Sequence, residues 1–262
     1  MSKHNITRAS DVFIGDAYFA PLHASQGSVG APISFIRQIA LGSPIALDVD
    51  GMIKAATSTE LPNNATITYT TADDGASPFD NTATPAPATI TDSTGTSRSV
   101  WTLDVPRNLT IQVTHNSSIV AMSVTVTGFD VYGQMMKETL SVAATGTDTP
   151  AAGLKAFKHI LSIAVTSAGN ATTNTLNMGW GDVLGLPFKA DYKADVLRVS
   201  FNDAWDDSAT IGAADDSTPT ATTGDVRGTV DTNSASDGSR VIVWMKVDGS
   251  SKDTLVGQAQ YS

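Results

Sequence analysis

The sequence predicts an all-β protein: an antiparallel β-sandwich or jelly-roll-like domain that follows an extended N-terminal arm. Apolar residues alternate with Thr and Ser in many short segments, and this period of two places one set of side chains on a buried sheet face. Clusters of Gly, Pro, Asn, Asp and Ser separate these segments, as turn residues separate strands. Only 16% of the residues are charged, whereas surface helices usually carry many Glu and Lys residues.

The clearest alternation lies in three consecutive segments at the centre of the chain. Val, Leu and Ile alternate with polar residues in 109–113 and again in 120–127, and a third strand is expected to follow. The turns between them are expected at 115–118 and 130–134, where a glycine supplies the positive φ that a tight hairpin needs. The alternation slips at Gly128, which predicts a bulge or the start of the loop.

Residues 1–58 are expected to form the N-terminal arm, and residues 59–262 the β-domain. Short apolar bursts in the arm are interrupted by Gly and Pro, so the segment cannot bury its own aromatic side chains. Two interpretations stay open: a strand pair that lies on the main domain, or an arm that docks on a neighbouring subunit. In the second interpretation the contact residues are Val12, Phe13, Ile14, Phe19, Phe35 and Ile36.

Further strands and two long loops are expected along the domain. The strands are predicted at 65–69, 99–105, 161–165, 175–180, 195–202, 225–230 and 240–247. Pro106 is expected to end the second of these, because proline cannot donate a ladder hydrogen bond. Residues 154–160 are either a lead-in to the next strand or one helical turn, and 181–188 form a compact crossing. The long loops are predicted at 72–95 and 203–223.

Composition excludes several classes of partner. A chain of 262 residues can bury a sizeable core as one large β-domain or two small ones. A net charge of −10 and the lack of a Lys/Arg cluster argue against nucleic-acid binding. The chain has no cysteine, which excludes disulfides and thiolate metal sites. Neither a signal-peptide core nor a membrane-spanning run is visible, so we expect no membrane partner and synthesis in a cytoplasm.

No catalytic motif stands out, and we expect no enzymatic activity and no cofactor. The histidines at positions 4, 23, 115 and 159 do not have metal-ligand spacing and are expected on the surface or in loops. The chain lacks a G-x-S-x-G nucleophile elbow. A Ser/His/Asp triad is still open, because its members need only meet in space.

Acidic loops and tryptophans allow two weaker hypotheses. Carboxylates at 48–50, 73–74, 203–207 and 215–216 could bind calcium, but no bidentate Glu follows the Asp-Val-Asp-Gly run at the right distance, so solvated loop charge is favoured. A carbohydrate site typically has an exposed aromatic side chain, on which a sugar ring can stack, beside acidic residues. Trp205 between Asp203 and Asp206, or Trp180 beside Asp182, could supply one, although packing is the favoured role for all four tryptophans.

Three runs between Val124 and Phe188 combine turn glycines with alternating core positions. They are VTVTGFDVYGQMMKETLSV, GLKAFKHILSIAV and LNMGWGDVLGLPF, and in these positions the chain resembles virion structural proteins of tailed bacteriophages. The residues that match are Val126, Thr127, Gly128, Asp130, Gly133, Glu138, Thr139, Lys155, Ala156, Phe157, Lys158, Ile160, Ser162, Ile163, Gly179, Gly181, Gly185, Leu186 and Pro187.

This resemblance implies a non-enzymatic particle component, most plausibly a capsid decoration (cement) protein. Such proteins commonly sit on the outer shell as homotrimers, bind the major capsid protein and bridge neighbouring capsomers. The expected location is therefore the capsid surface of a virion assembled in the host cytoplasm. The alternatives are another virion component, such as a tail, neck or fibre protein, and a carbohydrate-binding β-sandwich.

Overall fold

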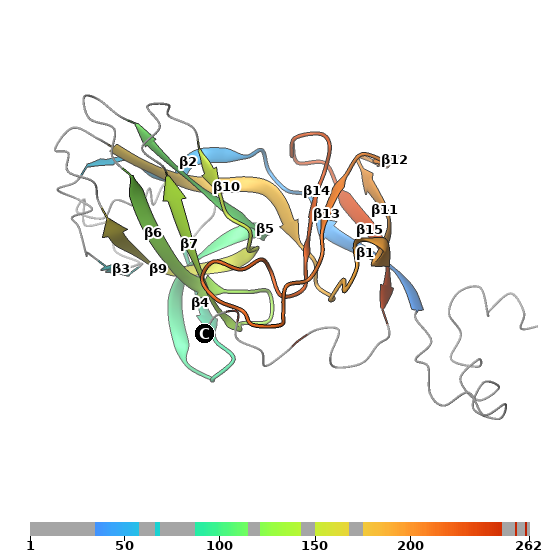
Figure 1. Cartoon of the computed structure of the whole chain (residues 1–262), viewed down its shortest axis with the longest axis horizontal. Helices are drawn as coiled ribbons and strands as arrows, with labels where there is room; N and C mark the ends of the chain where they lie inside the picture. The colour runs from blue at the N-terminus through green and yellow to red at the C-terminus, as the bar shows by residue number, and fades with distance from the viewer. Residues whose placement is uncertain are drawn as a thin grey trace, which may run out of the picture.

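The predicted all-β class is confirmed. The computed structural model describes residues 35–57, 66–68, 87–114, 121–142, 150–167, 175–247, 255 and 260. In this part of the chain the regular elements are strands and one short 3-10 helix, η1 (Lys193–Asp195) (Figure 1). The described residues contain no helix with the length and hydrophobicity to cross a membrane.

The strands belong to two sheets, and their bounds are as follows. They are β1 (Phe35–Gly42), β2 (Asp48–Thr57), β3 (Thr66–Thr68), β4 (Pro87–Thr91), β5 (Ser97–Thr114), β6 (Met122–Phe129), β7 (Met135–Val142), β8 (Ala151–Ala152), β9 (Phe157–Ser167), β10 (Thr175–Gly185), β11 (Val196–Phe201), β12 (Ala204–Trp205), β13 (Thr210–Gly212), β14 (Thr229–Asp231) and β15 (Val241–Val247).

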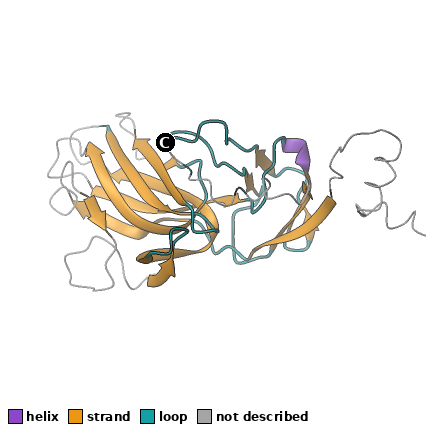
Figure 2. Cartoon of the chain, turned by 90° about the horizontal axis from the view of Figure 1, so that it is seen from below, coloured by secondary structure: helices purple, strands orange, loops and turns teal. Residues whose placement is uncertain are grey.

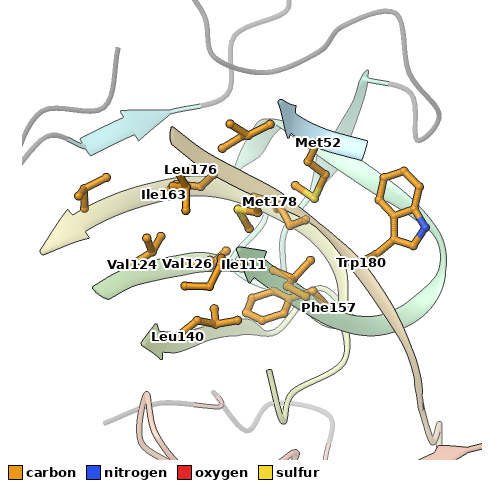
Figure 3. Packing of buried hydrophobic residues seen from close by; sticks show 14 of the residues in the cluster. Met52, Ile111, Val124, Val126, Leu140, Phe157, Ile163, Leu176, Met178 and Trp180 are labelled. Carbon is orange, nitrogen blue, oxygen red and sulfur yellow. The ribbon is translucent and has the colours of Figure 1, made fainter. Parts of the chain in front are cut away.

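The larger sheet has the order β13-β14-β10-β5-β9-β6-β7, and β2, β3, β4 and β8 pair with its members outside this path. It curls around the first hydrophobic core (Figures 1 and 2). Side chains from six strands converge there in Figure 3, among them Met52, Ile111, Val124, Val126, Leu140, Phe157, Ile163, Leu176 and Met178. Each fully buried aliphatic side chain contributes roughly 1.5–3 kcal/mol, so this core is the main source of stability.

The smaller sheet has the order β1-β15-β11-β12 and covers a second core. Val241, Val243 and Met245 of β15 point inward, toward Leu184 and Val230 of the larger sheet. All ladders in both sheets are antiparallel. Packing of one sheet on another across buried apolar faces is consistent with a β-sandwich, whereas the strand order does not confirm a jelly roll.

Strand β5 continues through Pro106 for 18 residues, so the prediction that Pro106 ends the strand is wrong. Proline is tolerated where no ladder hydrogen bond needs its missing N–H. Here the ladder to β9 jumps from Thr102 to Arg107, and Pro106 falls in this gap. Leu103 of β5 enters the first core and Val105 the second, so one strand belongs to both.

The predicted hairpin around 130–134 is confirmed as the β6–β7 pair. Gly133 has φ +73°, the conformation for which glycine was expected. The Asp130 carboxylate accepts the amides of Tyr132 and Gln134 at 2.8 and 2.9 Å, which fixes the turn. The slip at Gly128 is also confirmed, because the ladder between β6 and β9 shifts between Thr127 and Gly128.

Strand neighbours differ from strand sequence order. Strand β9 lies between β5 and β6, so the segments 109–113 and 120–127 do not pair with each other.

The turn predicted at 115–118 lies outside the described residues. Residues 154–160 form no helical turn; Phe157 already begins β9. β10 continues through the expected crossing to Gly185, and the strand predicted at 225–230 is the shorter β14.

The described part of residues 1–58 belongs to the sheets of this same chain. Strand β1 pairs with β15, and β2 pairs with β10. Met52 and Ile53 of β2 are completely buried in the first core. Residues 1–34 lie outside the described residues. The expected docking segment is therefore joined directly to an ordered edge strand.

Short strands occur inside both of the expected long loops. Residues 87–91 form β4, which pairs with β5 and extends the larger sheet. Pro87 is its first residue, a position where proline costs no ladder hydrogen bond. Within 203–223, β12 and β13 are each too short to show a periodicity in the sequence.

Close approach of β2 and β10 requires glycine at position 179. A Cβ atom there would lie 1.8 Å from the carbonyl oxygen of Asp48. We expect Gly179→Ala to lower the free energy of unfolding by about 1–3 kcal/mol, because backbone rather than a flexible side chain must move. Urea denaturation would measure the loss. Gly224→Ala is the control, since its Cβ would meet only the Asp215 side chain at 3.3 Å; equal losses would contradict this explanation.

Candidate functional site

The sequence-predicted contact residues that the structure describes lie at the start of β1. Ile36 is 45% exposed, and Phe35 pairs with Val247 at the end of the ladder. Val12, Phe13, Ile14 and Phe19 lie outside the described residues. The structure therefore places the end of the expected docking segment on the smaller sheet.

One face of the smaller sheet is turned away from the second core. Because Val243 and Met245 of β15 point inward, the alternate residues Trp244 and Lys246 point outward. Ile36 lies opposite Lys246, and Gln38 lies opposite Trp244. Both β1 residues are exposed. We call Ile36, Gln38 and Lys246 the β1 edge; it combines an apolar, an amide and a cationic side chain.

The β1 edge also presents unpaired backbone. β1 is the terminal strand of the smaller sheet, because β15 is its only ladder partner in the described chain. A terminal strand offers a row of N–H and C=O groups to which a strand from another molecule can pair. This geometry is suited to adding a strand in a neighbouring subunit or partner.

The opposite edge of the same sheet carries an exposed aromatic cluster. Trp205 of β12 is 54% exposed. Its indole lies 4.8 Å from that of Trp244 in an edge-to-face arrangement, and the Arg198 guanidinium lies 4.8 Å from its ring centroid. Core or interface packing was expected for all four tryptophans. Core packing is confirmed for Trp101 and Trp180, whereas Trp205 is exposed in this chain and leaves only the interface role open as a prediction.

A concavity adjoins Trp205. Its volume is about 350 Å³, and polar residues line most of it. Trp205, Asn202 and Asp206 come from the β11–β12 hairpin, while Asn233 and Ser234 come from the loop after β14. Trp180, the other candidate sugar platform, cannot serve, because it is 3% exposed and donates its indole N–H to the Ala46 carbonyl.

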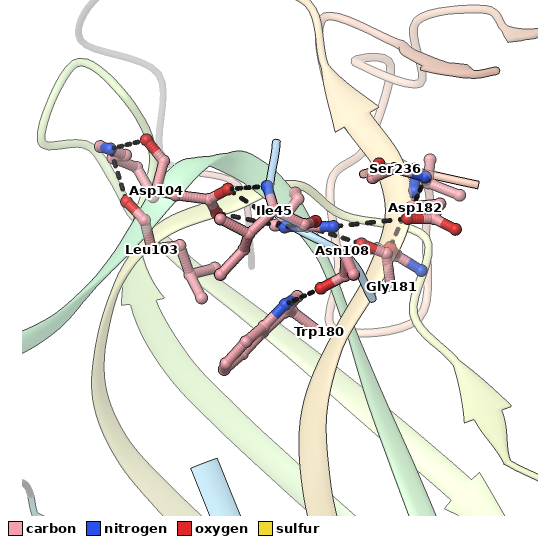
Figure 4. A network of polar contacts seen from close by, with 12 residues as sticks. Ile45, Leu103, Asp104, Asn108, Trp180, Gly181, Asp182 and Ser236 are labelled. Atoms are coloured by element: carbon pink, nitrogen blue, oxygen red, sulfur yellow. Dashed lines mark hydrogen bonds and ion pairs between the residues drawn. The ribbon is translucent and has the colours of Figure 1, made fainter. Parts of the chain in front are cut away.

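The first buried polar network lies where the two sheets meet (Figure 4). Arg107 is completely buried, and its guanidinium donates to the Gly181 carbonyl at 2.7 Å and the Ile45 carbonyl at 3.0 Å. It also pairs with the carboxylates of Asp104 at 3.2 Å and Asp182 at 3.4 Å. Desolvation lowers the pKa of Arg107, and these two carboxylates oppose that change. The network joins β5, β10 and the loop between β1 and β2.

The second network ties the β6–β7 hairpin to the loop before β14. Arg227 and Asp130 form a 2.8 Å ion pair with side chains that are 2% and 0% exposed. The Asp225 carboxylate accepts the amides of Ala156 and Arg227 at 3.1 and 2.9 Å. Burial raises the pKa of Asp225. These contacts fix the path of a long irregular segment that local sequence does not specify.

Glu138 belongs to the same region and has an unusual carboxyl group. One oxygen accepts the backbone amides of Leu154 and Lys155. The other oxygen is buried and has no hydrogen-bond partner among the described residues. Burial raises the pKa of Glu138 to about 7. Nearby, the buried Lys155 ammonium donates to the Gly224 carbonyl at 3.2 Å.

The remaining polar candidates show structural contacts. His159 lies in β9 rather than in a loop; its Nδ1 is 2.8 Å from the Thr102 hydroxyl, and desolvation lowers its pKa to about 4. The other three histidines lie outside the described residues, as do Asp73 and Asp74. Within the described ranges, no group of three or more His, Cys, Asp or Glu residues is arranged to hold a metal ion.

No family model, curated protein or solved structure matches this chain. The resemblance to phage virion proteins therefore stays a prediction. Its matching residues occupy scaffold positions: Gly133 forms the β6–β7 turn, Glu138 and Lys155 lie in the second network, and Gly179 allows β2 to approach β10.

Two kinds of signal could have located the exposed cluster from sequence. Val199 and Phe201 alternate toward the second core, so Ser200 lies on the opposite face of β11, where it is itself buried. A two-residue turn at Asn202–Asp203 then places Trp205 opposite Ser200 on the same face. The buried Arg107 in β5 and the buried Lys155 just before β9 carried no such signal, because charged residues are normally solvated.

Proposed function

We propose that this chain is a structural, non-enzymatic virion protein that decorates the outside of a tailed-phage capsid and cements neighbouring capsomers. The observation that carries the proposal is the β1 edge. Strand β1 is partly apolar, pairs with β15 on one side only among the described residues, and continues directly from residues 1–34. We further propose that the protein acts as a homotrimer and that the major capsid protein is its partner. The resemblance of residues 124–188 to virion proteins supports this assignment.

The apolar content of residues 1–34 supports docking through this edge. This segment contains Val12, Phe13, Ile14 and Phe19, whose burial against a partner would contribute roughly 1.5–3 kcal/mol each. Main-chain pairing along β1 would add direction and register. Many such contacts, repeated over a shell, give cumulative strength although each is individually modest.

The charge balance fits a protein exposed on a finished particle. The chain has 26 acidic and 16 basic residues. A net negative surface rich in Thr and Ser keeps an assembly soluble and discourages non-specific association. The basic residue on the β1 edge, Lys246, offers a local contact for an acidic partner surface.

The deciding experiment combines location with truncation. Mass spectrometry and labelling of purified particles should find the protein in many copies on the head; its presence only on the tail would favour a different virion role, and its absence would contradict the proposal. A variant lacking residues 1–34 should fail to bind capsids stripped of this protein. Its circular dichroism should remain that of the β-protein, because the described residues form two cores without any contribution from the deleted segment.

A point variant tests the β1 edge itself. Ile36→Ser is expected to weaken capsid binding by about tenfold, equivalent to about 1.4 kcal/mol. Leu47→Ser is a matched control, because Leu47 is also 45% exposed but precedes β2 and lies outside the β1 edge. Cosedimentation with stripped capsids would measure both. Equal binding by the two variants would count against docking at the β1 edge.

A further inference from the structure

The concavity beside Trp205 lies at the edge of the smaller sheet opposite β1. The strand order places β15 and β11 between β1 and β12, so the two edges are separate surfaces. The proposed capsid docking therefore does not require Trp205. The function of the concavity is a separate question.

Two loops form this concavity and are fastened to each other. Asn202 and Asp203 both have positive φ, 51° and 60°, which makes the tight turn between β11 and β12. The Asp206 carboxylate accepts the Asn233 amide at 2.8 Å through one oxygen and the Ser208 amide at 3.2 Å through the other. Asp206 follows β12 and Asn233 follows β14, so this contact fixes the spacing between the two loops.

Trp205 is exposed, yet its neighbours restrict its orientation. Trp244 meets the indole edge-to-face and Arg198 lies over the ring, each at 4.8 Å. A large aromatic side chain whose orientation is already restricted can bind a ligand with little loss of conformational entropy. Its indole is apolar, whereas most of the surrounding surface is polar. A matching ligand must offer both an apolar face and several hydrogen-bonding groups.

The polar groups define the ligand further. Asn202, Asn233 and Ser234 have exposed side chains that can both donate and accept hydrogen bonds. Asp206 retains acceptor capacity beyond the two amides that it binds. No Lys or Arg lines the concavity among the described residues, and the Arg198 guanidinium beside it lies against the Trp205 ring. An anionic ligand is therefore disfavoured, and hydroxyl groups are favoured.

We propose that the Trp205 concavity is a binding site for a neutral sugar. The face of the indole that Arg198 does not cover stacks against the C–H face of a pyranose ring. Asn202, Asn233 and Asp206 bind its hydroxyl groups. A volume of about 350 Å³ accommodates a sugar unit at the lower end of the range for small-ligand sites. This inference goes beyond the proposed structural role and does not depend on it.

The test is an NMR titration of the isolated, ¹⁵N-labelled full chain. Four tryptophans give resolvable indole N–H signals, and Trp205→Phe identifies the one from Trp205. The probes are cellobiose, maltose, lactose and N,N′-diacetylchitobiose. Each is used at about 10 mM, a concentration high enough to detect weak binding. At least one should shift the Trp205 signal in a saturable manner. Digalacturonic acid should not.

Variants distinguish a site from general contact. Trp205→Ala should weaken binding of the responding sugar by more than about tenfold, and Asn233→Ala by about three- to tenfold. Tyr192→Ala, which removes a 73% exposed aromatic side chain that does not line the concavity, should leave affinity unchanged. Capsid binding should be unchanged in Trp205→Ala, so the two proposals can fail separately.

Three results would overturn the sugar site. One is no shift of the Trp205 signal with any of the four neutral sugars. The second is binding only of digalacturonic acid, which would contradict the charge assignment. The third is equal loss of affinity in Tyr192→Ala and Trp205→Ala. If Trp205→Ala fails to fold, Asn233→Ala and Trp205→Phe decide the question, because both keep the hairpin and its aromatic contact.

Discussion

Replacing Arg107 with alanine is expected to lower the free energy of unfolding by about 3–5 kcal/mol, the usual cost of leaving a buried charge partner alone. Arg107 is completely buried and binds two carboxylates and two backbone carbonyls. Removing it leaves Asp104 and Asp182 without their cation at the junction of the sheets. Both the cavity and the unpaired acceptors contribute to the loss.

Urea denaturation of parent and variant, followed by tryptophan fluorescence, measures this effect. Arg240→Ala is the matched control. Its guanidinium also pairs with a carboxylate, at 2.6 Å from Asp203, but the two side chains are 55% and 74% exposed. An exposed pair contributes only about 0–1 kcal/mol. A similar small loss for Arg107→Ala would refute the assigned role of the buried network.

Glu138→Gln is expected to make the protein's stability less dependent on pH. The pKa of Glu138 is raised from 4.5 to about 7 by burial. A raised carboxyl pKa means that the folded state favours the neutral form, so the stability contribution is complete below pH 4.5 and is lost as the pH rises through 7. The loss amounts to about 3 kcal/mol. Gln keeps the oxygen that accepts two amides and cannot ionise.

The measurement is the difference in unfolding free energy between parent and variant at pH 5 and pH 8. The unfolding free energy of Glu138→Gln minus that of the parent should be about 2–3 kcal/mol higher at pH 8 than at pH 5. Taking the difference removes the contribution of groups that titrate equally in both proteins, including most of the effect of Asp225. A difference that stays constant with pH would show that the Glu138 carboxyl is not held neutral in the folded state.

Local chemistry in the sequence was sufficient to predict the class and the β6–β7 hairpin. Alternation in 120–127, the polar turn and Gly133 all concern residues close together in the chain. The insertion of β9 between β5 and β6 could not be predicted in this way. Periodicity states which face of a strand is buried, but it does not state which distant strand supplies the hydrogen bonds.

Pro106 and Trp205 illustrate the same limit at single residues. Proline normally interrupts a strand, yet Pro106 falls where β5 changes partners and no ladder bond is required. Tryptophan is usually buried, yet Trp205 is held at the edge of a two-residue strand. For Ile36 the sequence predicted an apolar contact residue, and only the fold shows that it belongs to an edge strand.

The position of β1 determines how the protein would bear mechanical load. Consider a pulling force applied to the chain before Phe35 and directed along β1. The force would act on β1 at its Phe35 end, while the Gly42 end is joined to β2 of the larger sheet. The β1–β15 ladder, paired from Phe35↔Val247 to Gly42↔Val241, would then be loaded in shear, with its hydrogen bonds sharing the force instead of breaking one after another. Forced rupture is governed by an unfolding rate rather than by equilibrium stability. A strand held by such a ladder would resist force along its axis better than force that peels it from the sheet edge.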